Sequence, residues 1–253
     1  TENRMQVVRF QAEAGDVELN EGDAGSYPAA VRDALQVGVL CNNASLPEKA
    51  GDGQAAGVGD PMEVALLEAG RDAGLERDAL LESLPEDHEE AFDPDTKLMA
   101  TVHETDEGTW LYAVKGAPEA VLERAARVRT NGDARPLTDD DRERWRQTNR
   151  DMAGRGLRVL AFAQKRADAA DAPPYEDLEL LGFAGLMDPP RAAVREGLAE
   201  CQRAGIRVVM ITGDQAETAL YVGRELGLAQ DGEATVGPRF DDDETLSDEE
   251  KEE

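Results

Sequence analysis

The sequence predicts an α/β protein in two parts: an α+β part up to Met187, then a shorter segment with doubly wound order. Two strand-like runs, 97–104 and 109–116, are separated by TDEG, which is typical of a hairpin. After Asp188 the order becomes helix, continuous apolar strand, helix, the order that builds a parallel sheet covered on both faces. Because only one such strand follows residue 187, we expect this second part to be incomplete.

The first half of the chain contains three further elements. A short strand is expected at 4–10, followed by a Gly- and acid-rich connection. Helical spacing over 28–44 begins with Pro28, a residue favoured in a first turn. A second helix is expected within 57–74, with Asp60 as its N-cap and Pro61 as its first residue.

The second half alternates helices with strands. The expected elements are helices within 117–129 and 138–156, strands at 157–165 and 178–187, a helix at 188–205, a strand at 206–212 and a helix after it at 215–227. The acidic run 241–253 lacks the regular spacing and the glycine of a calcium-binding loop, so we interpret it as a solvated tail.

Composition excludes some classes of function. The formal charge is −28, which argues against a nucleic-acid surface because such a surface needs a basic stripe. Cys41 and Cys201 are far apart and no His cluster accompanies them, so we expect neither a disulfide framework nor a metal site. No apolar window of membrane-spanning length and no signal peptide is found, so we expect a soluble piece.

Two stretches carry residue types suited to a phosphorylated ligand. KGAPE places Lys115 and Gly116 between a strand and a helix, where a cation and a close backbone approach suit a base or a phosphate. FDPDTKLM offers an aromatic ring, a cation and a soft apolar side chain for a purine at Phe92, Lys97 and Met99. Each stretch also has a structural explanation: a surface lysine in the first, core side chains in the second.

Two charges have ambiguous local roles. Glu63 lies in the first turn of its helix, where the helix dipole alone explains a carboxylate. Arg158 is the one charge in an apolar strand, so it must point outward or meet an anion.

The TGD sequence at Thr212 to Asp214 follows the last apolar strand. The next helix offers free N–H groups there, Gly213 permits close approach, and Thr212 adds a hydroxyl, which together suit a phosphate. Asp214 serves either as the N-cap or beside a phosphate-bound Mg²⁺.

Seven motifs occur in the order found in one known family. CNNA, GDPMEVALL, FDPDTKLM, KGAPE, GLRVLAFA, GLMDPPR and MITGDQAETA together resemble the cytosolic signatures of the P-type cation-transporting ATPases, in particular the calcium-pump-like subgroup. The resemblance runs from Thr1 to about Leu228. It implies a nucleotide-binding domain, with a mainly antiparallel sheet flanked by helices, inserted into a phosphorylation domain of the haloacid-dehalogenase type.

The resemblance also implies domain boundaries and residue roles. The start of the phosphorylation domain would be 1–8, the nucleotide-binding domain 9–186, the partial phosphorylation domain 187–240 and the tail 241–253. The residues implied are Glu63, Phe92, Lys97, Met99, Lys115, Gly116 and Arg158 for ATP, Asp188, Pro189, Pro190 and Arg191 for the hinge, and Thr212, Gly213 and Asp214 for phosphoryl transfer. Glu63 would bond the adenine, Phe92 would stack on it, and Arg158 would reach the phosphates.

Two signatures of that family are absent from this chain. DKTGTLT supplies the phosphorylated Asp and GDGVND helps to hold Mg²⁺, and neither sequence occurs here. Pro94 also stands where many relatives have an arginine. We therefore expect a piece of a cation pump, from the cytoplasmic side of a membrane, whose partners are ATP, Mg²⁺ and the remaining phosphorylation, actuator and transmembrane domains. The piece would bind ATP without forming an aspartyl phosphate.

Two other functions fit parts of the sequence. A haloacid-dehalogenase-like phosphatase also uses a strand-end Thr, but it needs a DxDx(T/V) nucleophile that is not present. A non-catalytic acidic adaptor would retain the fold without binding nucleotide.

The charge balance predicts dependence on salt. Only five of the 27 basic residues are Lys, and 55 residues are Asp or Glu, a composition suited to a salty cytoplasm in which ions screen self-repulsion. We expect the melting temperature to rise from low to multimolar KCl, measured by circular dichroism. A melting temperature indifferent to KCl would contradict the hypothesis.

Overall fold

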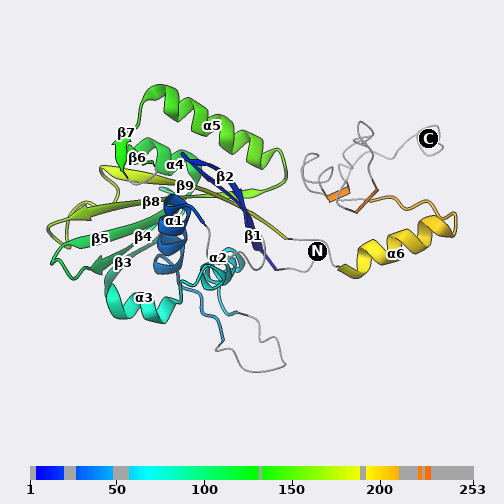
Figure 1. Ribbon diagram of the computed structural model, residues 1–253, viewed down its shortest axis with the longest axis horizontal. Helices are drawn as coiled ribbons and strands as arrows, with labels where there is room; N and C mark the ends of the chain where they lie inside the picture. The colour runs from blue at the N-terminus through cyan, green and yellow to red at the C-terminus, as the bar shows by residue number, and fades with distance from the viewer. Residues whose placement is uncertain are drawn as a thin grey trace.

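A computed structural model of the protein describes residues 4–19, 27–47, 57–130, 133–188, 192–210, 222–223 and 226–228. The central feature is one twisted sheet with helices on both faces (Figure 1). Its strands are β1 (Gln6–Ala12), β2 (Gly15–Glu18), β3 (Glu86–Asp93), β4 (Leu98–Glu104), β5 (Trp110–Gly116), β6 (Ala125–Arg129), β7 (Ala134–Pro136), β8 (Arg158–Ala167) and β9 (Leu178–Met187). The helices are α1 (Ala29–Leu40), α2 (Pro61–Asp72), α3 (Arg77–Ser83), α4 (Pro118–Arg124), α5 (Asp139–Ala153) and α6 (Ala192–Arg203).

The strand order is β2-β1-β9-β8-β5-β4-β3, and every neighbouring pair in this series is antiparallel. A short branch, β6 with β7, joins the first part of β9 in parallel. The two predicted strands around TDEG are β4 and β5, and their register places Met99 opposite Lys115. The prediction of a mainly antiparallel sheet flanked by helices is confirmed.

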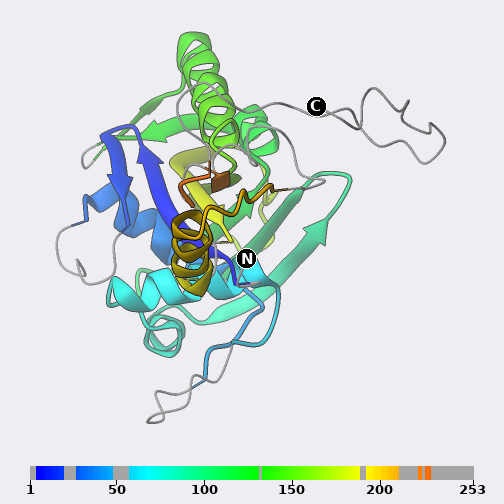
Figure 2. The same ribbon diagram turned by 90° about the vertical axis from the view of Figure 1, so that its right-hand side faces the viewer.

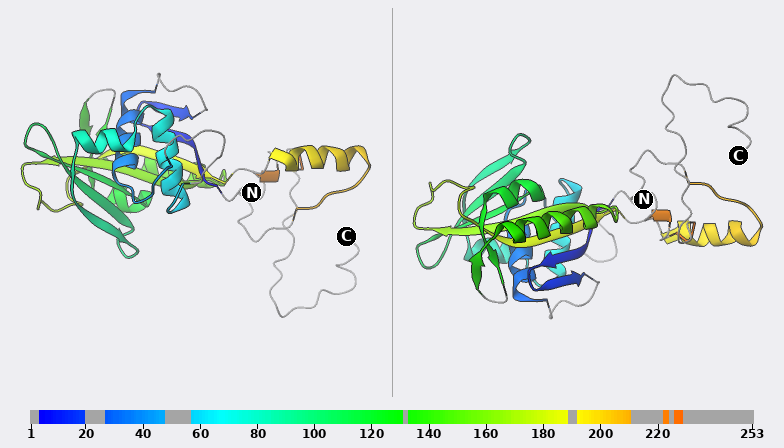
Figure 3. Two further views of the ribbon diagram at one scale, coloured as in Figure 1. Left: turned by 90° about the horizontal axis from the view of Figure 1, so that it is seen from below. Right: turned by 90° about the horizontal axis from the view of Figure 1, so that it is seen from above.

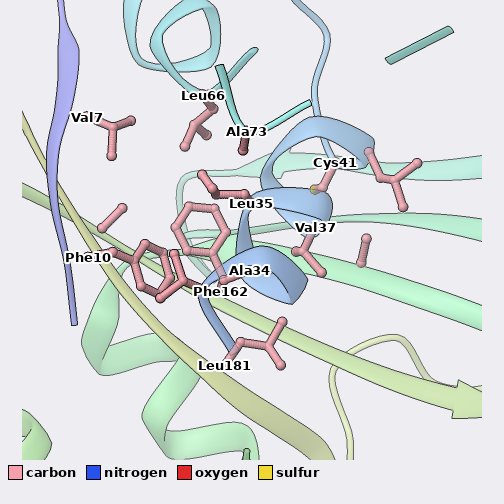
Figure 4. Close-up of a cluster of buried hydrophobic side chains, with 14 of the residues drawn as sticks. Val7, Phe10, Ala34, Leu35, Val37, Cys41, Leu66, Ala73, Phe162 and Leu181 are labelled. Atoms are coloured by element: carbon pink, nitrogen blue, oxygen red, sulfur yellow. The ribbon is translucent and has the colours of Figure 1, made fainter. Parts of the chain in front are cut away.

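Helices α1, α2 and α3 cover one face of the sheet. Helix α1 is apolar on almost all sides and lies over β5, β8 and β9. Its Gly38 allows close packing, since a Cβ there would be 3.2 Å from the Phe162 ring. Figure 4 shows the core beneath these helices, where Phe10 and Phe162 have ring centroids 6.0 Å apart.

Helices α4 and α5 cover the opposite face, as the views from the side and from above and below show (Figures 2 and 3). Trp145 of α5 packs edge-on against Phe183 of β9 with a centroid separation of 4.7 Å. Thr138 caps α5 through a reciprocal capping box with Asp141, which confirms the helix start expected from the sequence. The Arg135 guanidinium beside Asp141 holds the pKa of that carboxyl well below its usual range.

The described elements include five that the sequence did not predict, among them the short strand β7, which pairs with β6. Strand β2 lies within the Gly- and acid-rich connection after β1, and Val17 packs on the core. The helix expected over 117–129 ends at Arg124 because the chain then pairs with β9 as β6. Helix α3 and edge strand β3 were also missed: β3 is largely exposed, so it lacks the apolar alternation by which strands are recognised.

The segment after Met187 is only partly confirmed. Helix α6 is present, but residues 206–210 have no regular secondary structure, so the strand expected at 206–212 is wrong over this range. Ile206 and Val209 are exposed, which fits an apolar run that has no sheet to join within the described residues. The TGD sequence and almost all of the helix expected after it lie outside the described residues.

The start of β1 and the end of β9 lie side by side. Gln6 at the start of β1 pairs with Met187 at the end of β9, and the Arg4 amide donates to the Asp188 carboxylate at 3.4 Å. Asp188 is therefore placed where a hinge is expected, while Pro189, Pro190 and Arg191 lie outside the described residues. Among the described helices, none has the length and apolar character needed to cross a bilayer.

His103 is buried in β4 in its neutral form. Its Nδ1 is 3.0 Å from the Leu84 carbonyl and its Nε2 is 2.8 Å from the Thr101 hydroxyl, so one nitrogen donates and the other accepts. Burial lowers the pKa of His103, and the positive charge of Arg77 adds to this effect.

The lowered pKa of His103 predicts acid sensitivity. The unfolded chain takes up a proton below about pH 6.5 that the folded chain resists, so stability falls there by up to about 1.4 kcal/mol per pH unit. We expect the stability advantage of wild type over His103→Gln to shrink between pH 7.5 and 5 in urea unfolding. His88→Gln, at the exposed second histidine, is the control. A constant difference between wild type and His103→Gln would contradict the prediction.

Candidate functional site

A buried ion pair joins the sheet to α2. Lys115 Nζ on β5 lies 2.5 Å from Glu63 Oε1, and the two side chains are only 8% and 15% exposed. Charges are seldom buried unless they are paired, and the cost of removing both from water often exceeds their attraction. Such a pair is weak as a stabilising device, so its position indicates a functional site.

The residues that begin helix α2 determine the position of Glu63. The Asp60 carboxylate caps the helix by accepting from the Met62 amide at 2.8 Å, and Pro61 is the first helical residue, as predicted. Glu63 consequently lies in the first turn, where the helix dipole favours a carboxylate. The Asn43 amide donates to its second oxygen, Oε2, at 3.2 Å.

Asn42 connects the end of α1 to the start of α2. Its amide nitrogen donates to the Gly38 and Glu63 carbonyls at 3.1 and 3.0 Å, and its side-chain oxygen accepts from the Ala44 amide at 2.8 Å. The carbonyl of this buried residue also accepts from Arg77 at 2.6 Å. The CNNA motif is therefore a positioning segment for Glu63, a role that the sequence did not reveal because the bonds cross two elements.

The register of the sheet places Lys115. It stands opposite Met99 on β4 and Phe162 on β8, so all three side chains lie on the face covered by α1 and α2. The Cys41 thiol donates to the Met99 carbonyl at 3.6 Å beneath the pair. Burial raises the pKa of Cys41 to about 11, against a smaller lowering by Lys115, so the thiol stays protonated.

The chain makes a close approach beside Lys115. The Ala117 amide donates to the Lys97 carbonyl at 3.1 Å, and a Cβ at Gly116 would be 2.2 Å from that carbonyl oxygen. Only glycine fits this position. Lys97 has a φ of 57°, a left-handed conformation unusual for a residue with a side chain, and its ammonium lies 2.9 Å from Glu119 Oε1.

Phe92 and Arg158 extend the site in two directions. Phe92 is 58% exposed and occurs at a register irregularity of β3, in the stretch facing the start of β4. Arg158 is exposed at the start of β8 on the same face as Phe162, roughly 13 Å along the strand at about 3.4 Å per residue. Arg158 is thus exposed, as its isolated charge required, and it stands opposite Leu186 near the end of β9.

The structure brings most of the expected ATP-binding residues to one edge of the α2-covered face. Glu63, Lys115 and Met99 form its buried part, whereas Lys97 and Phe92 are more exposed. A hollow of about 290 Å³ lies away from the ion pair, between β1 and α2, where Val7, Ala65 and Ala69 are among its lining residues. Thr212, Gly213 and Asp214 lie outside the described residues.

The described part of the chain contains no group of three or more His, Cys, Asp or Glu side chains able to hold a metal ion. Mg²⁺ at nucleotide sites is commonly held by one or two carboxylates together with the phosphates of the ligand, and Asp214, the carboxylate for which this role was expected, lies outside the described residues.

The fold and this site define an α/β domain that pairs a buried carboxylate with a buried ammonium. The family model described as "P-type ATPase, cytoplasmic domain N" matches residues 30–193, and the chain belongs to this family. It is 35% identical over 245 residues to calcium-transporting ATPase 1 of Bacillus cereus, which covers 95% of this chain and 27% of that protein.

Two further relatives match a similar share of the chain. A calcium-transporting ATPase of Bacillus subtilis is 33% identical over 219 residues, 85% of this chain and 24% of that protein. The sodium/potassium-transporting ATPase alpha subunit of Tetronarce californica is 29% identical over 265 residues, 93% of this chain and 25% of that protein. The chain thus spans about a quarter of the length of these curated relatives.

Removing one partner of the buried pair should destabilise the fold. Lys115→Met leaves the Glu63 carboxylate buried without its counter-charge, and we expect a loss of about 3 kcal/mol in urea unfolding. Adding Glu63→Gln should restore most of that loss. Lys97→Met, which breaks a half-exposed pair, is the control and should cost less than about 1 kcal/mol. Equal losses for Lys115→Met and Lys97→Met would refute the interpretation.

Proposed function

We propose that this chain binds ATP beside the contact between the first turn of α2 and strand β5, which Glu63 and Lys115 form. Glu63, Met99, Lys115 and Gly116 would surround the base, and Phe92 would stack on it. Lys97 would line the same pocket, and Arg158 would reach the phosphates. Because the Lys97 ammonium is half exposed, we propose that it meets the phosphates as well. The observation that carries the proposal is the buried Glu63–Lys115 pair, in a chain that belongs to a family of ATPases. The exposed Phe92 ring is on β3, two strands away from Lys115 in the sheet.

The chemistry of these groups suits adenine. The Glu63 carboxylate is an acceptor, and adenine carries an exocyclic amine that donates. The Phe92 ring is largely free of protein contact on its exposed side, and aromatic rings stack on bases of any kind. Met99 contributes a polarizable apolar surface below the Lys115 ammonium.

Ligand binding would have to replace contacts that the chain makes with itself. Both oxygens of Glu63 are engaged, one by Lys115 and one by the Asn43 amide. A base that bonds to Glu63 therefore competes with the ammonium, and only the surplus over the lost ion pair contributes to affinity. Weak and reversible binding follows.

We further propose that the whole protein is a cation pump that couples ATP hydrolysis to transport through an aspartyl phosphate. Residues 187–240 would belong to its phosphorylation domain, with Thr212, Gly213 and Asp214 facing the phosphoryl group and Asp188 at the hinge. The remaining phosphorylation, actuator and transmembrane domains would be its partners, and the part described here would lie on the cytoplasmic side. The paired connections at Gln6 and Met187 support a hinge, since both crossings lie at one place.

Nucleotide titration of the isotope-labelled chain tests the site. We expect ATP to shift the amide resonances of Phe92, Lys97, Lys115 and Gly116, with an affinity at least several-fold higher than that of GTP. GTP is the control because guanine presents a carbonyl where adenine presents its amine. Phe92→Ala should weaken ATP binding by roughly 1–3 kcal/mol, the range for base stacking on an aromatic ring.

Two results of the titration would overturn the proposal. Shifts that avoid these residues would place the ligand elsewhere. An absence of shifts with both nucleotides would favour the non-catalytic acidic adaptor.

A further inference from the structure

Glu119 forms an ion pair with Lys97, the lysine of the proposed site whose side chain is exposed to solvent. Its Oε1 lies 2.9 Å from Lys97 Nζ, and the two side chains are 59% and 53% exposed. The hydrogen bond from Lys97 lowers the pKa of Glu119, with a further contribution from its own backbone amide. The carboxylate is therefore ionised and faces the ammonium at neutral pH.

The backbone of Lys97 is fixed on both sides. Its amide donates to the Asp93 carbonyl at 2.7 Å, and its carbonyl accepts from the Ala117 amide at 3.1 Å. The left-handed φ of 57° is unfavourable for a residue with a Cβ, and glycine would suit it better. A lysine kept in such a conformation indicates that its side chain is needed there.

The same connection sets the position of Glu119. Ala117, which is bonded to Lys97, directly precedes α4, and Glu119 lies in the first turn of that helix. Lys115 and Gly116 come immediately before. The carboxylate is thus held beside the proposed ATP site by the backbone that builds the site.

We infer that Glu119 is a built-in competitor of the nucleotide phosphates: it holds Lys97 in the free chain and must release it when a phosphorylated ligand binds. This inference rests on the proposed function. It assigns to Glu119 a role in selecting between phosphorylated and unphosphorylated ligands, because an uncharged nucleoside has nothing to exchange for the carboxylate.

The exposure of the Lys97–Glu119 ion pair determines how much its removal should change the affinity for ATP. An ion pair exposed to this degree is worth little, so freeing Lys97 should raise the affinity for ATP by about two- to fivefold. Salt screens such a pair, and the gain should decline as KCl is raised. Because the chain is strongly acidic, removal of any negative charge also favours an anionic ligand, and the experiment must separate the two effects.

Glu123 supplies the matched control. It lies four residues further along α4, is 80% exposed, and has only a loose contact of 3.7 Å with its neighbour Arg124. Glu119→Gln and Glu123→Gln remove the same charge from the same helix. We would titrate wild type, both variants, Lys97→Met, and Lys97→Met with Glu119→Gln against ATP and adenosine at low salt.

The expected result is a gain in ATP affinity for Glu119→Gln over Glu123→Gln, no gain for adenosine, and no gain when Lys97 is Met. Equal ATP affinities of the two glutamate variants, an equal gain for adenosine, or a gain that persists with Lys97→Met would each overturn the inference. If wild type binds ATP and Glu119→Gln binds it equally well, the inference about Glu119 fails and the proposed function stands. Wild type that binds neither ligand overturns both.

Discussion

The contact between Glu63 and Lys115 is the constraint on which the rest of the site depends. It joins the first turn of α2 to strand β5, which lies between β4 and β8, across a face otherwise filled by apolar side chains. Neither charge could remain there alone, because an unpaired buried charge costs several kcal/mol. The Asp60 cap, the Asn42 side chain and the sheet register all fix the geometry of this one pair. A core made for stability would have used two apolar groups instead.

Two backbone exceptions beside the pair support the same view. Gly116 admits the Lys97 carbonyl where any side chain would collide, and Lys97 adopts a conformation that favours glycine. Each departs from what local preference would choose, and the two departures are joined through the Ala117 hydrogen bond. Strain of this kind persists only when the surrounding structure holds it, and it gathers where a ligand is handled. The ends of β4 and β5 therefore serve the site as well as the sheet.

The sequence predicts those parts of the fold that are encoded locally. The cap at Asp60, the capping box at Thr138 and the β4–β5 hairpin depend on residues within a few positions of one another. By contrast, β6 interrupts a good helical pattern because β9 offers it hydrogen bonds, and β3 shows no apolar alternation because both its faces are largely exposed. The candidate site also combines features that are encoded locally with contacts that depend on how distant segments pack. The first-turn position of Glu63 was evident, but its pairing with Lys115, 52 positions away, depends on how helix and sheet pack. The bond of Glu119 to Lys97 also joins two distant stretches, and no local signal reveals it.

The charge of the whole chain opposes the ligand that the site suits. A protein of net charge −28 repels a polyphosphate at low ionic strength, and the few cations at the site act against that field. At molar salt the screening length falls to about 3 Å, so the distant carboxylates cease to matter while contacts within the site persist. The exposed Lys97–Glu119 pair is weakened by the same salt, whereas the buried Glu63–Lys115 pair is screened much less. High salt thus lowers the general repulsion of an anionic ligand and the hold of Glu119 on Lys97, but it weakens the attraction of the exposed Lys97 for phosphate in the same way. The buried pair is the contact that salt changes least. An acidic composition and an ATP site are therefore compatible in a salty solution.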